Sequence, residues 1–283
     1  MAQPPGTKRV IINADDFGFS RGITEGILQA YRLGLVTSTT IAANMPAADE
    51  AIARLGEAPR LGVGVHLNVS QGPPLSNEAR VLADSDGIMR LSAARVVGLC
   101  VRKPRMLHVI EAEYDAQIRW VLDHGVSPTH LDSHRHTHGF PPVFARVAAL
   151  ARRYNIRFVR WHREALPGTG WPAGPPGQRR VRRLLNLCAW IDARIAPELI
   201  ATRGTWGIEH TGAIDVPWLV RAACAIQPGV TEIMTHPGLA DDVDEETSRL
   251  RASRKRELAA LCDRTVAETL KVWGIERVHY GQI

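Results

Sequence analysis

Residues 9–18 of this chain read Arg9-Val10-Ile11-Ile12-Asn13-Ala14-Asp15-Asp16-Phe17-Gly18. The run of β-branched residues from Val10 to Ile12 is typical of a strand buried in a parallel sheet. Two adjacent carboxylates follow it, at the strand end where parallel α/β folds bind ligands. A divalent cation offsets the desolvation and mutual repulsion of such a pair. The alternative is a plain strand-to-helix turn in which one aspartate caps the next helix.

The length of 283 residues suits one large α/β barrel or two domains. Hydrophobic residues make up 45% and charged residues 23% of the chain, as in an ordinary globular protein. No apolar run approaches the ~20 residues of a membrane span, and the first residues contain no apolar signal core. The four cysteines are widely separated, which favours reduced core thiols and a cytoplasmic location.

The net charge is +6, and arginines gather at 179–183 and 249–256. No nucleic-acid motif and no interleaved aromatic residues accompany them, so we expect solvated helix faces and no nucleic-acid partner. The mixed basic and apolar segments 95–109 and 179–195 favour, as an alternative, an amphiphilic substrate or a peripheral membrane contact. The sequence is also compatible with a homodimer.

Hydrophobic periodicity predicts alternating strands and helices along the whole chain. Strands are expected at 9–13, 36–45, 61–69, within 129–138, and at 157–160, 231–236 and 277–281. Helices are expected at 21–34, 47–55, 93–101, 109–125, 143–154, 184–195, 218–226 and 249–272. This order predicts an α/β fold with parallel strands and crossover helices.

No repeat or linker divides the chain, so we expect a single domain over 1–283 with its core at 8–281. Two insertions interrupt the pattern, near 71–108 and 163–181. The second is rich in Gly and Pro and is predicted to be irregular. Residues 204–207 are predicted to lie in a loop.

Polar residues end four of the predicted strands: the Asp15-Asp16 pair, His66, the cluster at 130–138, and His236. Because parallel strands end on one face, we expect these side chains to converge. One carboxylate and two imidazoles form a familiar ligand set for a divalent metal with open positions for water and substrate.

Within the cluster, Asp132, His134 and His136 alternate, and on an extended backbone they would share one side. The alternative is an exposed loop with scattered histidines. We choose Asp16, His66 and His134 as metal ligands, with His136 as the alternative third ligand.

The remaining aspartate, Asp15, would then lie beside the metal and could act as a general base. His236 could be the general acid, provided that a carboxylate supports its protonation; the alternative is a turn histidine before Pro-Gly. Trp161, Trp171 and Trp206 lie in or near loops and could form a platform for a sugar ring, or could be ordinary partly buried residues.

Four motifs together resemble the YdjC-like carbohydrate deacetylase family, which includes chitooligosaccharide deacetylases and proteins associated with hopanoid biosynthesis. The resemblance covers about residues 8–281, and segment 163–181 matches none of the family motifs. The motifs are Asn13-Ala-Asp-Asp-Phe-Gly, Gly64-Val-His-Leu-Asn, His130-Leu-Asp-Ser-His-Arg-His-Thr-His and Met234-Thr-His-Pro-Gly.

The resemblance implies an irregular, TIM-like (β/α) barrel with its active site at the C-terminal ends of the strands. It implies a metal-dependent hydrolase that removes an N-acetyl group from an amino sugar, in an oligosaccharide or a glycolipid such as a hopanoid glycoside. It implies Asp15 as base and Asp16, His66 and a histidine of the 134–136 segment as ligands. Mg²⁺ or Zn²⁺ is the expected cofactor, with Mn²⁺ or Co²⁺ as alternatives.

Two other functions are compatible with the same residues. Clusters of Asp and His also serve phosphoesterases or sugar lyases, although phosphate chemistry usually employs two metals. A sugar-binding protein without catalysis could retain the same ligands, but the presence of Asp15 argues against it.

Overall fold

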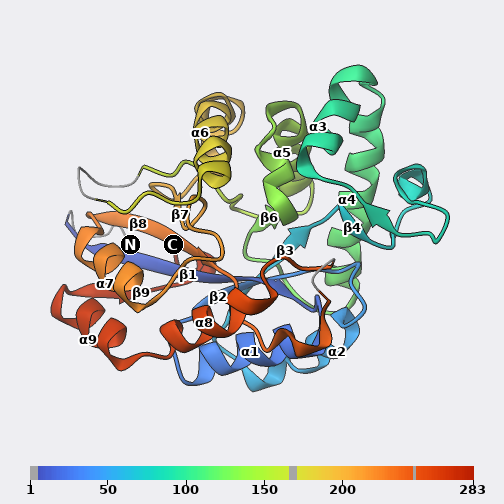
Figure 1. The fold of residues 1–283 in the computed structure, drawn as a ribbon. Helices are drawn as coiled ribbons and strands as arrows, with labels where there is room; N and C mark the ends of the chain where they lie inside the picture. Colours follow the sequence, from blue (N-terminus) through green and yellow to red (C-terminus); the bar gives the residue numbers. More distant parts are fainter. Residues whose placement is uncertain (1–5, 166–170, 245–246) are drawn as a thin grey trace.

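The computed structural model describes residues 6–165, 171–244 and 247–283 (Figure 1). Its main sheet has seven strands in the order β6-β3-β2-β1-β8-β7, with β9 also paired to β1, and all of these pairings are parallel. The strands are β1 (Lys8–Phe17), β2 (Ser38–Ile41), β3 (Gly62–Leu67), β6 (Leu131–Ser133), β7 (Thr205–Trp206), β8 (Gly229–Thr235) and β9 (Ile275–Arg277).

Helices surround this sheet, with α1, α2 and α8 on one side and α3 to α6 on the opposite side of the view (Figure 1). The helices are α1 (Arg21–Arg32), α2 (Ala48–Ala53), α3 (Ala93–Arg102), α4 (Met106–Asp123), α5 (Pro141–Arg153), α6 (Pro176–Ile195), α7 (Val216–Ala225), α8 (Arg251–Leu261) and α9 (Arg264–Val272). Within the described ranges, none of them has both the length and the apolar character of a membrane span.

The two edge strands of the sheet, β6 and β7, are joined through the extended segment 158–163. The backbone N–H of Leu131 donates to Phe158, and that of Arg160 donates back to Leu131, at 3.0 and 2.8 Å. On the other side of the segment, Thr205 N–H donates to the Arg163 carbonyl at 3.0 Å. The sheet therefore curls into an irregular barrel, which confirms the predicted fold class.

The central strand β1 is apolar because both of its faces are covered. Val10, Ile11 and Ile12 are all at most 1% exposed. The strand does not stop at Asn13, as the sequence suggested, but continues to Phe17 through a register shift against β2. Asp16 lies in this irregular part and has a left-handed φ of 75°. The last residues of β1 therefore do not follow the simple alternation of a regular strand.

Helix α1 brings the loop after β8 close to the end of β1. Ser20 caps this helix and accepts a hydrogen bond from Ile23 N–H at 3.2 Å. A Cβ on Gly26 would lie 2.5 Å from the Gly238 Cα, so only glycine permits the approach. This contact positions the loop that carries His236.

Several predicted boundaries are wrong. The strand expected at 36–45 covers only Ser38–Ile41, and the loop expected at 204–207 contains the short strand β7. The helix expected over 249–272 is broken into α8 and α9, because Asp263 caps a new helix by accepting from Thr265 N–H. Residues 157–160 form bridges to the sheet without becoming a regular strand.

The irregular stretch expected at 163–181 ends earlier than predicted. Helix α6 begins at Pro176, a residue type favoured in the first turn of a helix because its missing N–H has no intrahelical partner there. Part of the stretch, residues 166–170, lies outside the described residues.

The insertion at 71–108 contains a small antiparallel hairpin, β4 (Gln71–Gly72) with β5 (Met89–Arg90), followed by α3. A buried carboxylate on α4, that of Glu113, anchors the insertion. It accepts hydrogen bonds from the backbone N–H groups of Leu75 and Ser76 at 3.0 and 2.8 Å, and from Gln117 at 2.8 Å. This anchor fixes the insertion, which contributes Gln71 and Ser92 to the cavity described below.

Replacing Glu113 with alanine should leave these buried donors without an acceptor. We expect the free energy of unfolding, measured in urea, to fall by at least about 2 kcal/mol. Glu111→Ala is the matched control on the same helix, since it breaks partly exposed contacts with Arg146 and His108 and should cost less than about 1 kcal/mol. Equal losses for the two variants would show that Glu113 is no anchor.

Candidate active site

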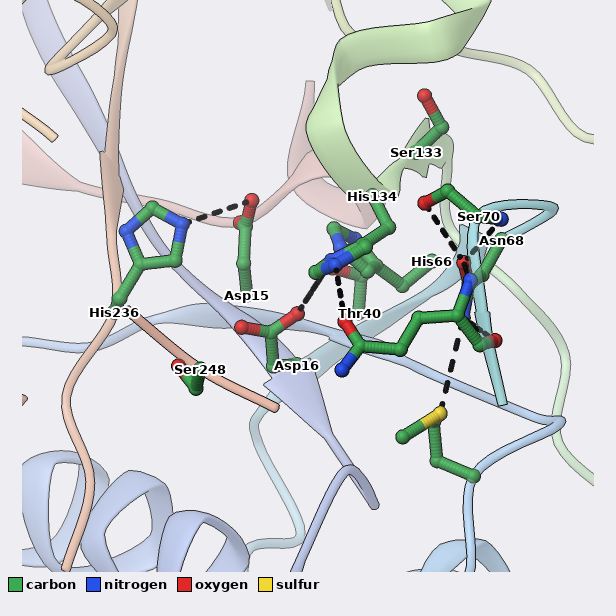
Figure 2. A network of polar contacts seen from close by, with 12 residues as sticks. Asp15, Asp16, Thr40, His66, Asn68, Ser70, Ser133, His134, His236 and Ser248 are labelled. Carbon is green, nitrogen blue, oxygen red and sulfur yellow. Dashed lines mark hydrogen bonds and ion pairs between the residues drawn. The ribbon is translucent and has the colours of Figure 1, made fainter. Parts of the chain in front are cut away.

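The predicted site residues meet at the carboxyl ends of adjacent parallel strands. Asp15 and Asp16 end β1, His66 lies near the end of β3, His134 follows β6 and His236 follows β8. All five side chains line one cavity of about 540 Å³. Figure 2 shows His66 and His134 directed toward Asp16, with His236 approaching Asp15 from the other side.

Asp16 forms the centre of a compact ligand set. Its Oδ1 atom lies 3.2 Å from His66 Nε2 and 3.3 Å from His134 Nδ1. This buried oxygen accepts no well-formed hydrogen bond, and the three ligand atoms lie within 4.8 Å of one another. One carboxylate oxygen and two imidazole nitrogens around an unsatisfied oxygen fit a divalent cation. The other oxygen, Oδ2, accepts from Arg254 at 2.5 Å.

The ring of His66 is held in place at Nδ1, the nitrogen that faces away from Asp16. Its Nδ1 lies 2.8 Å from Asp132 Oδ1 and 3.1 Å from the Thr40 hydroxyl. A carboxylate behind a histidine fixes the ring orientation and directs the opposite nitrogen forward. Burial opposes the charged imidazolium, but the carboxylates of Asp132 and Asp16 raise the pKa of His66 to about 10.

The 134–138 segment does not continue as an extended strand. A 3₁₀ turn begins at His134, and both Arg135 and His136 have left-handed φ angles, 56° and 55°. The expected alternation of Asp132, His134 and His136 on one side is therefore wrong. His134 joins Asp16, whereas Asp132 lies behind His66.

His136 also lines the cavity, but it does not belong to the group around Asp16. Its buried Nδ1 has no hydrogen-bond partner among the described residues, and burial holds its pKa well below the usual value. The two other histidines of the 130–138 cluster make structural contacts. His138 bonds Ser133 and the Arg160 carbonyl, and His130 stacks on Tyr280.

Asp15 is paired with a fully buried arginine that the sequence analysis did not single out. Arg160 donates to both carboxylate oxygens of Asp15 at 2.7 Å. The same guanidinium contacts Asp132 at 2.8 Å and Glu232 at 2.9 Å. Burial would raise the pKa of Asp15, but the Arg160 charge holds it well below its usual range. Asp15 is therefore ionised and rigidly oriented.

His236 faces the same aspartate from the opposite side. Its Nε2 lies 4.0 Å from Asp15 Oδ2, and its backbone N–H donates to Glu257 at 2.7 Å. Burial lowers the pKa of His236 to about 4, and the nearby Asp15 carboxylate compensates only in part. The predicted carboxylate support is present, but the ring is neutral at pH 7.

The three predicted tryptophans do not line the cavity. Trp171 packs edge-on against Trp206, which is buried, and Trp161 donates to the Ala189 carbonyl at 3.0 Å. Their contacts are those of structural packing. The aromatic ring at the cavity is that of Phe19, which lies 5.9 Å from the His134 ring.

Comparison with known families gives one match that covers nearly the whole chain. The YdjC-like protein family matches residues 9–272. The chain belongs to the YdjC-like family.

Curated relatives of this YdjC-like protein carry the name carbohydrate deacetylase. The relative from Halalkalibacterium halodurans is 34% identical over 264 residues, which cover 92% of this chain and 98% of the relative. The relative from Geobacillus stearothermophilus is 32% identical and covers 96% of both chains. A crystal structure from Enterococcus faecalis V583, described as a cellobiose-phosphate cleavage protein, has a TM-score of 0.77 and 26% identity over 98% of both chains.

Replacing Arg160 with an uncharged residue should leave the buried carboxylates of Asp15, Asp132 and Glu232 without a compensating positive charge. We expect Arg160→Met to lower the free energy of unfolding of the metal-free protein by roughly 3–5 kcal/mol at pH 7. Arg153→Met is the control, because it breaks only an exposed pair with Asp115 and should cost less than about 1 kcal/mol.

The pH dependence of this loss of free energy of unfolding in Arg160→Met gives a second check. In the wild type the lowered pKa of Asp15 stabilises the fold above about pH 4, and this contribution is lost at lower pH. In Arg160→Met the largest influence that lowers the pKa of Asp15 is gone, and burial, opposed only by the weaker effects of His66 and His236, should raise this pKa. The loss of free energy of unfolding should therefore shrink as the pH falls from 7 to 5. A deficit independent of pH would contradict the charge argument.

Proposed function

We propose that this protein is a metal-dependent hydrolase that removes the N-acetyl group from an amino sugar. The names of its curated relatives support a carbohydrate deacetylase. The observation that carries the proposal is the position of Asp15, an ionised carboxylate beside the Asp16, His66 and His134 group in a cavity large enough for a sugar. The proposed substrates are N-acetylated oligosaccharides and glycolipids such as hopanoid glycosides.

The proposed ligands are Asp16, His66 and His134. Two imidazoles in a set of three favour Zn²⁺, Mn²⁺ or Co²⁺ over Mg²⁺, which prefers oxygen ligands. A second triad of ligand atoms, from Asp15, His66 and Asp132, shares His66 with the first. Arg160 already neutralises both carboxylates of that triad, which argues for one metal ion and against a two-metal phosphoesterase.

When bound, the metal would supply Lewis-acid activation of the acetamide carbonyl and lower the pKa of a water molecule. Asp15 is the residue placed to accept the proton of the attacking water. Its low pKa makes it a weak base, so it suits a water that is already acidic. Arg160 holds the carboxylate by two hydrogen bonds and prevents its rotation.

His236 is the proposed donor to the departing sugar amine. Because the free ring is neutral at pH 7, we propose that His236 receives a proton during turnover, by transfer from Asp15, rather than carrying one at the start. The 4.0 Å separation of the two groups suits this transfer after a small adjustment. We also propose that residues 8–281 act as one catalytic domain, since the site draws on strands from both ends of the chain.

Asp15→Asn should abolish the base without removing a metal ligand. We expect acetate release from N-acetylglucosamine oligomers to fall by about 100-fold or more, because a positioned base contributes that order of rate. Metal content should remain near one ion per chain. Asp241→Asn, at an exposed carboxylate, is the control and should retain full activity. Near wild-type turnover by Asp15→Asn would refute the assigned base.

The two histidines of the turn can be separated by metal analysis. We expect His134→Ala to lose bound metal in equilibrium dialysis against Zn²⁺, with affinity lowered by about 100-fold or more, because one of three ligands is missing. His136→Ala is the matched control, since His136 lines the same cavity outside the ligand group. The reverse order of affinities would move the third ligand to His136.

A further inference from the structure

Helix α6 presents an apolar face to solvent. Leu184, Leu187, Trp190 and Ile191 are between 39% and 63% exposed. On a helix of 3.6 residues per turn these positions fall on one side, opposite the buried Leu185 and Ala189. Figure 1 shows α6 at the edge of the molecule, where it packs on α5. Exposed leucines and a tryptophan grouped on one helix are unusual for a face that meets only water.

The same face is basic. Arg180, Arg183 and Arg194 are exposed and lie among the apolar residues. Arg194 covers the Trp190 ring, with its guanidinium 3.4 Å from the ring centroid. The one acidic residue of α6, Asp192, is buried against His162. Within the described ranges, Arg180 and Arg183 have no acidic partner, so this face carries uncompensated positive charge.

We propose that this face of α6 docks on an anionic membrane surface. A helix with Trp and Leu side chains among arginines has the composition of helices that lie in the lipid interface, where apolar groups enter the acyl boundary and arginines meet lipid phosphates. A second copy of the chain is a poorer occupant, because pairing two such faces would bring six arginines together without an acid. Nucleic acid would pair with the arginines but would leave the leucines exposed.

The helix also links this surface to the active-site cavity. Gln178 and Val181, in its first turns, line the cavity, and Val181 is itself 40% exposed. The apolar face therefore begins at the rim of the site. Docking through α6 would place the rim at the bilayer and select amino sugars attached to lipid. This choice of substrate rests on the proposed function, whereas the docking itself does not.

Vesicle binding tests the docking without turnover. The full-length protein should co-sediment with vesicles of phosphatidylcholine mixed with phosphatidylglycerol, and should bind pure phosphatidylcholine far more weakly. We expect Leu184→Gln/Leu187→Gln/Trp190→Gln to lower the partition coefficient by roughly tenfold or more. Arg180→Glu/Arg183→Glu should lower it by at least roughly fivefold for each arginine.

The matched control is Leu33→Gln/Val272→Gln/Trp273→Gln, which removes exposed apolar side chains elsewhere on the surface and should bind vesicles like the wild type. All variants should keep wild-type acetate release from soluble oligosaccharides, which also reports on folding. The proposal is overturned if the wild type does not prefer anionic vesicles or if the α6 variants bind like the control. It is also overturned if the wild type is a dimer that the triple α6 variant dissociates. Absence of deacetylase activity would refute the proposed function while leaving the vesicle result decisive for docking.

Discussion

The site depends on one buried cation, the Arg160 guanidinium, which contacts Asp15, Asp132 and Glu232. Three carboxylates gathered in a protein interior repel one another and lose their hydration, so they can remain ionised only around a compensating charge. The contacts join the ends of β1, β6 and β8 to the segment that closes the barrel. The same guanidinium therefore connects the two sides of the barrel and orients the carboxylates of the site. Glu232 completes this network: its Oε1 accepts from Arg160, and its Oε2 accepts from the hydroxyls of Thr205 and Tyr280.

This arrangement explains how two adjacent aspartates can have the different roles proposed for them. In a regular strand they would point to opposite faces, and only one would reach the cavity. The register shift and the left-handed φ of Asp16 bring both carboxylates to the cavity wall. Both oxygens of Asp15 accept from Arg160, whereas Asp16 accepts from Arg254 only at Oδ2 and keeps Oδ1, beside two imidazoles, unsatisfied. Aspartate tolerates a left-handed backbone better than most residues, so the residue type suits both the chemistry and the conformation.

The sequence predicted the parts of the fold and site that rest on local patterns. The apolar run of β1 and the polar residues at strand ends predicted parallel strands and the convergence of Asp16, His66 and His134, whereas the barrel was implied by the resemblance to the YdjC-like family. Arg160 could not be predicted, because its role comes from partners 28 to 145 positions away in the sequence. The turn at His134 was missed because two successive left-handed residues without glycine leave no pattern. The break between α8 and α9 was signalled by Asp263, a good cap residue, but the helical periodicity on both sides concealed it.

The net charge of +6 combines two kinds of arginine, those buried in the site and those exposed on the surface. Arg160 and Arg254 are buried and offset the aspartates of the site, so they contribute little to the outer field. Arg180 and Arg183 on the exposed face of α6 have no acidic partner among the described residues, so they contribute to the charge of the outer surface. Because α6 forms both a wall of the cavity and an exposed basic face, the chemistry of the surface and access to the site are coupled through one helix. A rigid helix transmits this coupling without any conformational change, since the rim and the face are successive turns of the same element.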